Sequence, residues 1–569
     1  MMEKKVLEKD LVIIGGGAAG CFAAIKAHQM NPDLDILLVE KAHIERSGCL
    51  AAGINAINAY LTPGETPESF LEYIKKDSRG LVRDDLVYTI GQRVNEVTDT
   101  LDSWGLPILK NEDGSYQARS SRSIKIKGEK FKPLLADQVQ SRGIEVLNRT
   151  VATNYLREKG RVKGCFAFNL REEIFYTIQA GAVICATGGA SGIYQPNNTG
   201  QARHKMWYSP FNTGAGYAMG IRAGAEMTTF EMRFVALRVK DVLAPTGTFA
   251  FAGARQINSQ GEEYLDKYED VYTSLRLFAT VQEEKEGRGP CYLDLSHIDE
   301  RTGERVYKSL LDMCPGLVLM WEEQGVSPGE IKVQIEGTEP YIVGGHCQSG
   351  YWIDTRRQTT LPGLYAVGDV AGGAPKKYVT GAFVEAKLAV RDIVQKASPG
   401  NQVEVSVLRE KIEAEYERVT HPLTVTEGYK PDQLETRLQE IMENYAGGKS
   451  QFYELDAERL RKARKLLEEL ARDTKKLAAE NLHQLMLAHE VLDRLDVARV
   501  LTEHLLYRQE TRWPGYQTRI DYPECKLKWK KFVNSRYNSS EDNIEIIERK
   551  YYPLQEYLNY KEGVIDDDN

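Results

Sequence analysis

The stretch Asp10-Leu-Val-Ile-Ile-Gly-Gly-Gly-Ala-Ala-Gly20 decides the fold of this chain of 569 residues. Residues 11–14 form a continuous apolar run, which is typical of a parallel strand buried on both faces. Gly15, Gly17 and Gly20 then have the spacing G-x-G-x-x-G. Glycines at these positions allow a tight turn, close approach to a pyrophosphate and close packing of a helix on a strand. The pattern predicts a strand, a turn and a helix that together bind a dinucleotide.

The residues after this turn complete the predicted unit. We expect a helix over residues 18–29, whose first amides would face the phosphates. A second strand over residues 35–39 ends at Glu40, which lies 20 residues after Gly20, where an acceptor for a ribose hydroxyl belongs. The alternative is a glycine-rich turn without a ligand. The strand, helix, second strand and acid in register favour the dinucleotide site.

Two later segments favour FAD over NAD. Residues 182–186 (AVICA) predict another buried strand, followed by Thr187-Gly188-Gly189, and residues 363–367 predict a strand that ends in Gly368-Asp369. Flavoproteins with two dinucleotide-type domains use such a turn and a late Gly-Asp, whose Asp binds the ribityl chain. The expected FAD contacts are Gly15, Gly17, Ala18, Ala19, Gly20, Glu40, Lys41, Ser47, Gly48, Thr187, Gly188, Gly189, Gly368 and Asp369.

Composition excludes several classes of protein. Hydrophobic residues make up 42% and charged residues 27%, as in ordinary globular proteins. Lys and Arg number 74 against 82 Asp and Glu, and the formal net charge of −8 argues against a nucleic-acid binder. No run of about 18 apolar residues predicts a membrane span, and the charged N-terminus leads straight into a strand without the apolar stretch of a signal peptide. We therefore expect a large cytoplasmic enzyme.

The eight cysteines are scattered along the chain. No two of them lie within four residues of each other, so no CxxC pair exists. Zinc ribbons and iron–sulfur clusters need clustered thiolates, and we expect no metal site in this chain. Any iron–sulfur centre would then belong to a partner. The cysteines are Cys21, Cys49, Cys165, Cys185, Cys291, Cys314, Cys347 and Cys525.

Several further segments carry a resemblance that covers most of the chain. They are Ile44–Gly48 (IERSG), Ala56–Tyr60 (AINAY), Arg233–Asp241 (RFVALRVKD), Leu311–Cys314 (LDMC), Thr338–Tyr341 (TEPY), Gly344–His346 (GGH) and Glu510–Tyr516 (ETRWPGY). With them the chain resembles the fumarate reductase/succinate dehydrogenase flavoprotein superfamily, and within it the adenylylsulfate (APS) reductase alpha subunits. The segment E-T-R-W-P-G-Y is typical of these reductases and not of succinate dehydrogenases.

The resemblance implies an α/β fold in several parts. A discontinuous, Rossmann-like FAD-binding domain would comprise residues 1–205 and 340–395, and an α+β capping domain over 206–339 would be inserted into it. From Pro399-Gly400 the composition changes, and residues 403–420 and 457–506 are rich in Leu, Glu, Lys, Arg and Ala at helical spacing. We expect a helical C-terminal domain and tail over 400–569. The tail from residue 517 would either wrap a partner protein or be a loosely ordered end.

Three departures from the fumarate pattern separate the two groups of enzymes. Many fumarate and succinate enzymes attach FAD covalently to a His after Arg-Ser, whereas this chain has Gly48 there, which implies non-covalent FAD. Where fumarate reductases place a proton-donating Arg, counting back from Gly287 gives Thr273, with Arg276 nearby. Instead of Phe-His-Pro-Thr, the chain has the basic stretch of residues 233–241. A dicarboxylate reducer needs a proton donor, whereas a nucleotide sulfate needs cations.

The predicted active site rests largely on the resemblance, which places Asn58, Trp207, Arg238 and His346 around the isoalloxazine and the substrate sulfate. The expected substrate-binding residues are Arg233, Lys240, Phe251 and Arg276. Phe251 stands where the family has a Leu over the adenine side of the pocket. If residues 233–240 are extended, 238 and 240 share a face and 233 lies on the other. Arg238 and Lys240 would then converge on one anion, with the Arg as a planar fork. The alternative is a solvated charged edge.

His346, Trp207 and Asn58 also have structural interpretations. His346 follows Gly344-Gly345, which permits close backbone approach to a ring, but a single His is as often structural. Trp207 would stack beside a flavin, although a Trp often serves only as core. Asn58 offers both a donor and an acceptor, and the alternative is a turn-forming Asn.

The resemblance implies a mechanism and a partner. Reduced flavin N5 would attack the sulfur of APS, AMP would leave, and the flavin–sulfite adduct would release sulfite. Electrons would come from a ferredoxin-like beta subunit with 4Fe–4S clusters, in a hetero-oligomer. Two alternatives stay open: a flavoprotein that reduces fumarate or another small acceptor, and an FAD-binding electron-transfer or scaffold subunit without its own substrate.

Overall fold

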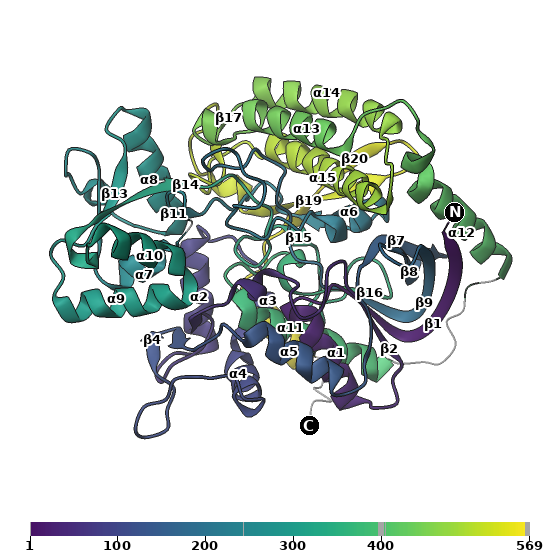
Figure 1. The fold of residues 1–569 in the computed structure, drawn as a ribbon, viewed down its shortest axis with the longest axis horizontal. Coiled ribbons are helices and arrows are strands. Elements are labelled where there is room, and N and C mark those ends of the chain that lie inside the picture. Colours follow the sequence, from purple (N-terminus) through teal and green to yellow (C-terminus); the bar gives the residue numbers. More distant parts are fainter. Residues whose placement is uncertain (1, 243, 397–402, 404, 564–569) are drawn as a thin grey trace.

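The computed structural model of this chain describes residues 2–242, 244–396, 403 and 405–563 (Figure 1). Its central sheet has the strand order β6-β2-β1-β9-β8-β7, and β16 also pairs with β9. Strands β6, β2, β1, β9 and β16 run parallel where they pair, and β8 runs antiparallel to β7 and β9. The strands are β1 (Glu3–Ile14), β2 (Ile36–Val39), β6 (Glu145–Leu147), β7 (Thr150–Glu158), β8 (Arg161–Asn169), β9 (Ile174–Cys185) and β16 (Leu364–Ala366).

Strand β1 lies in the middle of the sheet for a reason visible in the sequence. Residues 11–14 are buried and pair with β2 on one side and β9 on the other, so they need apolar side chains on both faces. The prediction of this strand was right but too short. The strand begins at Glu3, and its charged first half is mostly exposed and pairs with β9 from Glu3↔Ile174 onward.

Helices cover one face of this sheet near the glycine turn. Helix α1 (Ala18–Met30) packs on α11 (Tyr378–Lys396), where the rings of Phe22 and Phe383 stack with centroids 4.6 Å apart. Helix α5 (Phe131–Gln140) packs on α1 as well. The predicted helix over 18–29 is therefore confirmed to within one residue.

A smaller group of elements follows β2 in the chain. Helix α2 begins with a capping box in which Thr66 accepts from the Ser69 amide and the Ser69 hydroxyl accepts from the Thr66 amide. Three short strands pair antiparallel in the order β3-β5-β4. The elements are α2 (Pro67–Asp77), α3 (Asp84–Gly91), α4 (Val94–Ser103), β3 (Ala56–Ile57), β4 (Ala118–Ser120) and β5 (Ser123–Lys125).

The inserted elements form their own layer at one end of the molecule, on the left of Figure 1. Their sheet is antiparallel with the order β11-β14-β13-β12, and its core contains the buried side chains Phe249 and Trp321. The strands are β11 (Leu237–Val239), β12 (Arg255–Ile257), β13 (Cys291–Asp294) and β14 (Lys332–Gly337), and the helices are α7 (Thr246–Phe251), α8 (Thr273–Lys285), α9 (Glu300–Met313) and α10 (Pro315–Gln324).

The C-terminal part contains the predicted helices and an additional hairpin. Helix α14 is amphipathic, and its buried face consists of Leu460, Ala463, Leu467 and Leu470. The helices are α12 (Val405–Thr424), α13 (Pro431–Tyr445), α14 (Ala457–Asp473), α15 (Leu482–Tyr507) and α16 (Leu554–Gly563).

The predicted helical C-terminal domain and tail over 400–569 also contain a β-hairpin, which was not predicted from the sequence. Strands β19 (Lys531–Asn538) and β20 (Asn543–Lys550) form a hairpin that extends the sheet of β15 (Gly350–Tyr351) and β10 (Met227–Thr228). Most of the tail up to residue 563 is thus folded against its own chain. Residues 564–569 lie outside the described part.

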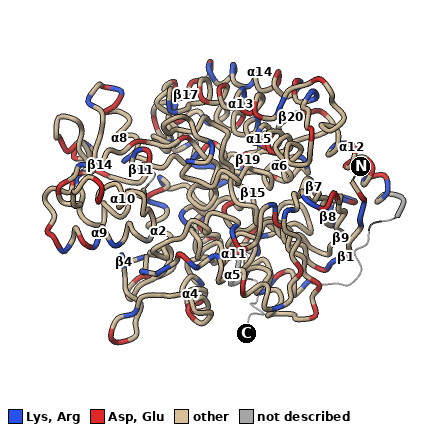
Figure 2. The backbone as a smooth tube through the Cα atoms, viewed as in Figure 1, with Lys and Arg blue, Asp and Glu red and all other residues tan. Residues whose placement is uncertain are grey.

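Charges of both signs are interspersed along the backbone (Figure 2), in agreement with the mildly acidic composition. Among the described residues, no helix is both long and apolar enough to cross a membrane. In the same residues, no three His, Cys, Asp or Glu side chains are grouped as metal ligands would be. All eight cysteines are free thiols.

Candidate active site

The glycine turn after β1 leaves no room for side chains. Gly15 has φ +103°, and a Cβ on Gly20 would lie 1.8 Å from the carbonyl oxygen of Gly15. A Cβ on Gly15 would lie 2.6 Å from the carbonyl oxygen of Ala186, at the end of β9. These positions therefore require glycine, and the backbone stays open to a ligand at the N-terminus of α1.

Glu40 and Ser47 brace this turn from the next segment of the chain. The buried Glu40 carboxylate accepts from the amide of Gly16 at 2.6 Å and from that of Ala42 at 2.6 Å, and the Ser47 hydroxyl donates to the Gly16 carbonyl at 2.9 Å. Gly48 lies so close that its Cβ would be 3.0 Å from the Cα of Gly17. Gly48 thus lies against the glycine turn.

The late Gly-Asp also reaches this region. Strand β16 pairs with the end of β9, so Gly368 and Asp369 lie beside the Thr187–Gly189 turn. The Tyr208 hydroxyl donates to Asp369 at 2.8 Å, and burial raises the pKa of this carboxyl group. A Cβ on Gly345 would lie 1.8 Å from the same carboxylate.

The remaining predicted cofactor residues differ in their contacts. The Gly189 amide donates to the Tyr208 hydroxyl at 2.8 Å, and the Gly368 amide donates to Glu385 at 2.8 Å. The Lys41 ammonium pairs with Glu490 at 2.6 Å and donates to the Phe211 carbonyl at 2.7 Å, so it also has a structural role. The glycine-lined turn, the acid at the end of β2 and Asp369 fit the phosphates, ribose and ribityl chain of FAD.

Three of the predicted catalytic residues meet in one cluster of rings. The Arg238 guanidinium lies 4.8 Å from the centre of the Trp207 ring, and the Trp207 and His346 rings meet edge to face at 5.0 Å. Phe234 lies 4.7 Å from each of these two rings, and Tyr378 lies 5.5 Å from His346. Residues far apart in the sequence thus enclose two basic side chains with aromatic walls.

The two basic groups of this cluster keep unused hydrogen-bonding atoms. Arg238 donates from Nη1 to the Leu237 carbonyl at 2.8 Å, but its buried Nε has no partner in the described chain. Burial without a neighbouring carboxylate lowers the Arg238 pKa to about 10. Burial, together with the charges of Arg238 and Lys376, lowers the His346 pKa to about 3, and its buried Nδ1 is likewise unpartnered among the residues described. An anion that enters this site would meet donors that the protein does not itself satisfy.

Asn58, the fourth predicted catalytic residue, directly follows β3. Its side chain is exposed and makes no hydrogen bond within the described residues. Asn58 therefore remains available to a ligand, and its contact with a flavin stays a prediction.

The structure corrects the prediction for Arg233. Its guanidinium is completely buried and donates to the carbonyls of Tyr516, Ala446, Gly447 and Tyr453 and to the Tyr194 hydroxyl. These contacts tie the chain before β11 to the C-terminal part, and the complete burial of Arg233 keeps its guanidinium from a substrate.

Lys240 does not join Arg238 either. The regular strand β11 covers only Leu237–Val239, and the chain turns at Asp241, whose φ is +63°. Lys240 is exposed, and its charge acts on Asp241 and Glu284. The expected convergence of Arg238 and Lys240 on one anion is wrong because it assumed an uninterrupted extended stretch.

Phe251 and Arg276 belong to the inserted layer. Phe251 is 59% exposed, and its ring lies 4.8 Å from the guanidinium of Arg119. Arg276 lies one turn into α8. Its side chain is exposed to solvent, and the protein atoms around the guanidinium lower its pKa by partial desolvation. Both remain predicted substrate-binding residues at the edge of the inserted layer.

Sequence reasoning missed Arg119, on strand β4. Its guanidinium donates to the Asn55 amide oxygen at 3.3 Å and has no acidic partner in the part of the chain that the structure describes. Burial lowers its pKa. A Cβ on Gly247 would lie 4.0 Å from Arg119 Nη2, so this side chain reaches from the FAD-binding part to α7 of the inserted layer.

Sequence reasoning also missed Lys376. Its ammonium lies 2.9 Å from Asp77, and it donates to the Tyr73 hydroxyl at 3.1 Å and to the Thr273 hydroxyl at 3.0 Å. Asp77 in turn accepts from the Thr273 amide at 3.0 Å. Lys376 and Tyr378 both have positive φ, 54° and 51°, which is uncommon for residues other than glycine. No local pattern in the sequence indicated this cluster.

We call residues 73–79, at the end of α2, the α2 junction, because three parts of the chain meet there. Lys76 pairs with Asp270 at 3.0 Å, and the Arg79 guanidinium lies 5.2 Å from the Tyr272 ring. From the C-terminal part, Arg512 donates to the Arg79 carbonyl at 3.0 Å and the Trp513 indole donates to the Ser78 carbonyl at 3.0 Å.

The segment Glu510–Tyr516 continues from this junction to the ring cluster. A Cβ on Gly515, which has φ +87°, would lie 2.8 Å from the Ser274 carbonyl in α8. The Tyr516 ring lies 5.6 Å from that of Phe234. The motif E-T-R-W-P-G-Y thus holds the inserted layer and the ring cluster together.

Comparisons with known proteins place this geometry among flavoproteins. The model of a family described as FAD binding domain matches residues 10–383. The alpha subunit of the adenylylsulfate reductase of Megalodesulfovibrio gigas is 30% identical, over 96% of this chain and 96% of that protein. A solved adenosine-5-phosphosulfate reductase in complex with sulfite (covalent adduct) is 33% identical, with a TM-score of 0.90 over 97% of both chains. One subunit of the fumarate reductase (CoM/CoB) of Methanothermobacter marburgensis is 26% identical over 94% of this chain and 98% of that protein.

Proposed function

Because the chain belongs to the FAD-binding flavoprotein family and, within it, to the adenylylsulfate reductase alpha subunits, we propose that it interconverts APS with sulfite and AMP. It is a flavin-dependent oxidoreductase by this membership. The substrate is the proposed part. The observation that carries it is the pair Arg238 and His346, which lie in one aromatic cluster with Trp207. The buried Nε of Arg238 and the buried Nδ1 of His346 have no partner among the described residues.

The proposed reaction consumes two electrons, which an iron–sulfur partner subunit would deliver. In APS two electrons reduce sulfur from oxidation state VI to IV, the S–O bond to the phosphate breaks, and AMP and sulfite leave. FAD would be held without a covalent bond in the glycine-lined cradle, which is the turn after β1 with Glu40 and Ser47, and it would supply the two-electron chemistry there. The protein orients the substrate beside it and excludes water.

Each residue of the cluster has a role in this proposal. The Arg238 guanidinium binds the sulfate oxygens and stabilises negative charge on the leaving group. His346 is neutral at neutral pH because burial lowers its pKa, and it donates one ring N–H to the substrate. Trp207 packs beside the flavin, and Asn58 offers an amide to it. Arg119 adds a second guanidinium without an acidic partner in the described chain, which suits the phosphate of the nucleotide.

The domain division and the partner belong to the same proposal. We assign residues 1–205 and 340–395 to the FAD-binding domain, 206–339 to a capping domain and 400–569 to the C-terminal domain. Electrons come from an iron–sulfur beta subunit with 4Fe–4S clusters, because no clustered thiolates exist in this sequence. The eight free cysteines suit the reducing cytoplasm.

The test uses the FAD-loaded chain with sulfite, AMP and ferricyanide as electron acceptor. We expect sulfite to bleach the flavin absorbance and AMP to be required for acceptor reduction. No bleaching, or a rate that AMP leaves unchanged, would refute the APS assignment. The second candidate, a fumarate reductase, is favoured by the likeness to the Methanothermobacter protein. It is tested with fumarate and reduced viologen.

A further inference from the structure

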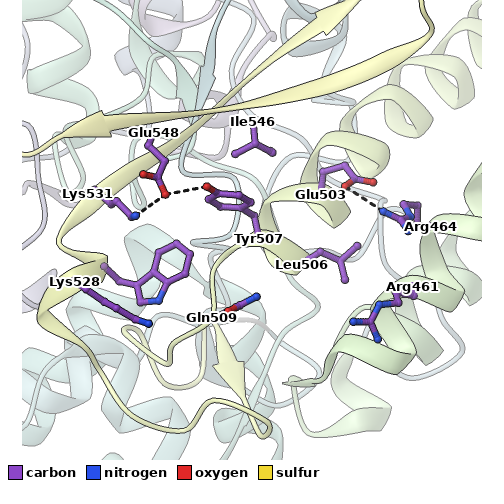
Figure 3. A pocket seen from close by; sticks show the side chains of 11 residues that line it. Arg461, Arg464, Glu503, Leu506, Tyr507, Gln509, Lys528, Lys531, Ile546 and Glu548 are labelled. Atoms are coloured by element: carbon purple, nitrogen blue, oxygen red, sulfur yellow. Dashed lines mark hydrogen bonds and ion pairs between the residues drawn. The ribbon is translucent and has the colours of Figure 1, made fainter.

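A pocket lies in the C-terminal part, apart from the ring cluster. It has a volume of about 540 Å³ and lies between α14, the end of α15 and the β19–β20 hairpin (Figure 3). Its lining residues are Arg461, Arg464, Glu503, Leu506, Tyr507, Gln509, Lys528, Trp529, Lys531, Ile546 and Glu548. None of them takes part in the proposed reaction.

The pocket has more positive than negative charge available to a ligand. Its two carboxylates are already engaged: Glu548 pairs with Lys531 at 2.5 Å and accepts from the Tyr507 hydroxyl at 2.8 Å, and Glu503 lies 3.7 Å from Arg464. All three interactions are drawn in Figure 3. The other two cations, Arg461 and Lys528, have no ion pair within the described residues, so the pocket carries two uncompensated positive charges.

An aromatic wall adds an unused donor. Trp529 is only 7% exposed, and its buried Nε1 has no hydrogen-bond partner among the residues described. The Tyr507 ring meets Trp529 edge-on at 5.7 Å, and the Lys531 ammonium lies 4.7 Å from the Trp529 ring. A buried N–H without a partner costs stability, which a ligand with acceptor groups would recover.

An exposed apolar side chain beside the lining residue Lys528 indicates that the ligand is larger than a single anion. Leu527, next to Lys528, is 85% exposed, the largest value among the exposed large hydrophobic residues of the described chain. A small anion would neutralise the cations but would leave this side chain in water. A peptide that carries carboxylates and apolar side chains would neutralise the cations and also cover Leu527.

We propose that this pocket is a docking site for an acidic segment of a partner polypeptide. Carboxylates of the segment bind Arg461 and Lys528, and an apolar side chain packs on Leu527 and the aromatic wall. Such charge complementarity raises the rate of association and selects against basic partners. The inference concerns a surface apart from the flavin and stands whether or not APS is the substrate.

The experiment measures binding of a fluorescent acidic peptide, acetyl-Glu-Glu-Leu-Glu-Glu-Leu, to the FAD-loaded chain by anisotropy. We expect saturable binding that weakens with salt. The double variant Arg461→Glu/Lys528→Glu should bind at least tenfold more weakly. The matched control Lys5→Glu/Lys130→Glu, which makes the same charge change at exposed positions away from the pocket, should bind within twofold of the wild type. Unchanged flavin content and melting temperature show that both variants are folded.

Four outcomes would overturn the proposal. The first is absence of peptide binding, and the second is equal binding by the double variant. The third is displacement of the peptide by inorganic phosphate at equal concentration, which would indicate a small-anion site. A chain that ends at Gly563 tests the acidic residues Asp566–Asp568 as occupant, and the fourth outcome, tighter peptide binding by it, would assign the pocket to the chain's own end. Sulfite bleaching of the flavin tests the proposed function separately.

Discussion

The dinucleotide cradle and the ring cluster are built in opposite ways. The cradle draws its turn, Glu40 and Ser47 from fewer than 50 consecutive residues, and these contact one another directly. The ring cluster takes Trp207, Arg238, His346 and Tyr516 from segments that lie far apart. A local site is specified by the space that its backbone leaves, whereas a distributed site depends on contacts between layers. Substitutions in the cradle should therefore lower the flavin content, and substitutions in the ring cluster should weaken substrate binding or turnover.

The largest effect is expected at Gly20. A Cβ there would lie 1.8 Å from the Gly15 carbonyl oxygen, so Gly20→Ala must displace the turn that receives the phosphates. We expect less than a tenth of the wild-type flavin content, measured from the flavin absorbance after purification. Gly316→Ala is the control, because a Cβ there meets nothing within 4 Å. Full flavin content in Gly20→Ala would contradict this account of the cradle.

Arg238→Ala should separate the two sites. Loss of a donor that stabilises developing charge typically lowers turnover by about 10²–10³. We expect at least a 100-fold loss of AMP-dependent sulfite oxidation with flavin content unchanged. Lys240→Ala should change the rate less than twofold because this side chain is exposed. If Lys240→Ala lowered the rate more than Arg238→Ala, the result would support binding of one anion by both cations and would contradict our placement of Lys240.

Asp77→Asn tests whether the α2 junction affects substrate binding at the ring cluster. The change removes the charge that compensates the buried Lys376 and weakens the contact with Thr273 in α8. We expect KM for the substrate to rise about tenfold, kcat to fall less and flavin content to stay constant. The free energy of unfolding should fall by about 1–3 kcal/mol, as for a buried charge left without its partner.

A second variant distinguishes this role from simple destabilisation. Lys376→Met in the Asp77→Asn background removes the unpaired cation, so the double variant should be more stable than Asp77→Asn alone. Additive losses of stability would contradict the pairing. Asp113→Asn, at an exposed turn, is the control.

The smallest effect concerns pH. The Arg238 pKa of about 10 lies below that of an ordinary guanidinium, so the group is charged at neutral pH and loses its proton as pH rises through about 10. Affinity for sulfite and AMP should be nearly constant between pH 7 and 9 and fall above pH 10. Because the Arg238 pKa is lower in the folded state than in the unfolded chain, the buried charge lowers the free energy of unfolding below pH 10. This loss of stability becomes smaller as pH rises above 10. An affinity that stays level to pH 11.5 would remove Arg238 from the anion site.

How far the sequence predicts each region follows from the same difference. The cradle was predictable because strand, turn, helix and Glu40 interact at short separation and each leaves a local pattern. Trp207, Arg238 and His346 were identified through the family resemblance, and the structure brings them together. Lys240 was misplaced because alternation along an extended strand was applied to residues 233–240, whereas the regular strand covers only Leu237–Val239. Arg233 was expected at the substrate as part of the basic stretch, although the same alternation already put it on the opposite face. Lys376 and Arg119 gave no local signal, since their importance comes only from partners in distant segments.

The position of Glu510–Tyr516 near the end of the sequence also has a consequence for biosynthesis. A ribosome has made the cradle by residue 48 and the predicted ribityl-binding Asp369 by residue 369, but the residues that fasten the α2 junction and approach Phe234 follow more than 140 residues later. A nascent chain can therefore complete its flavin cradle well before it can complete its substrate site. A chain truncated before residue 510 would lack the contacts that Arg512 and Trp513 make with the α2 junction.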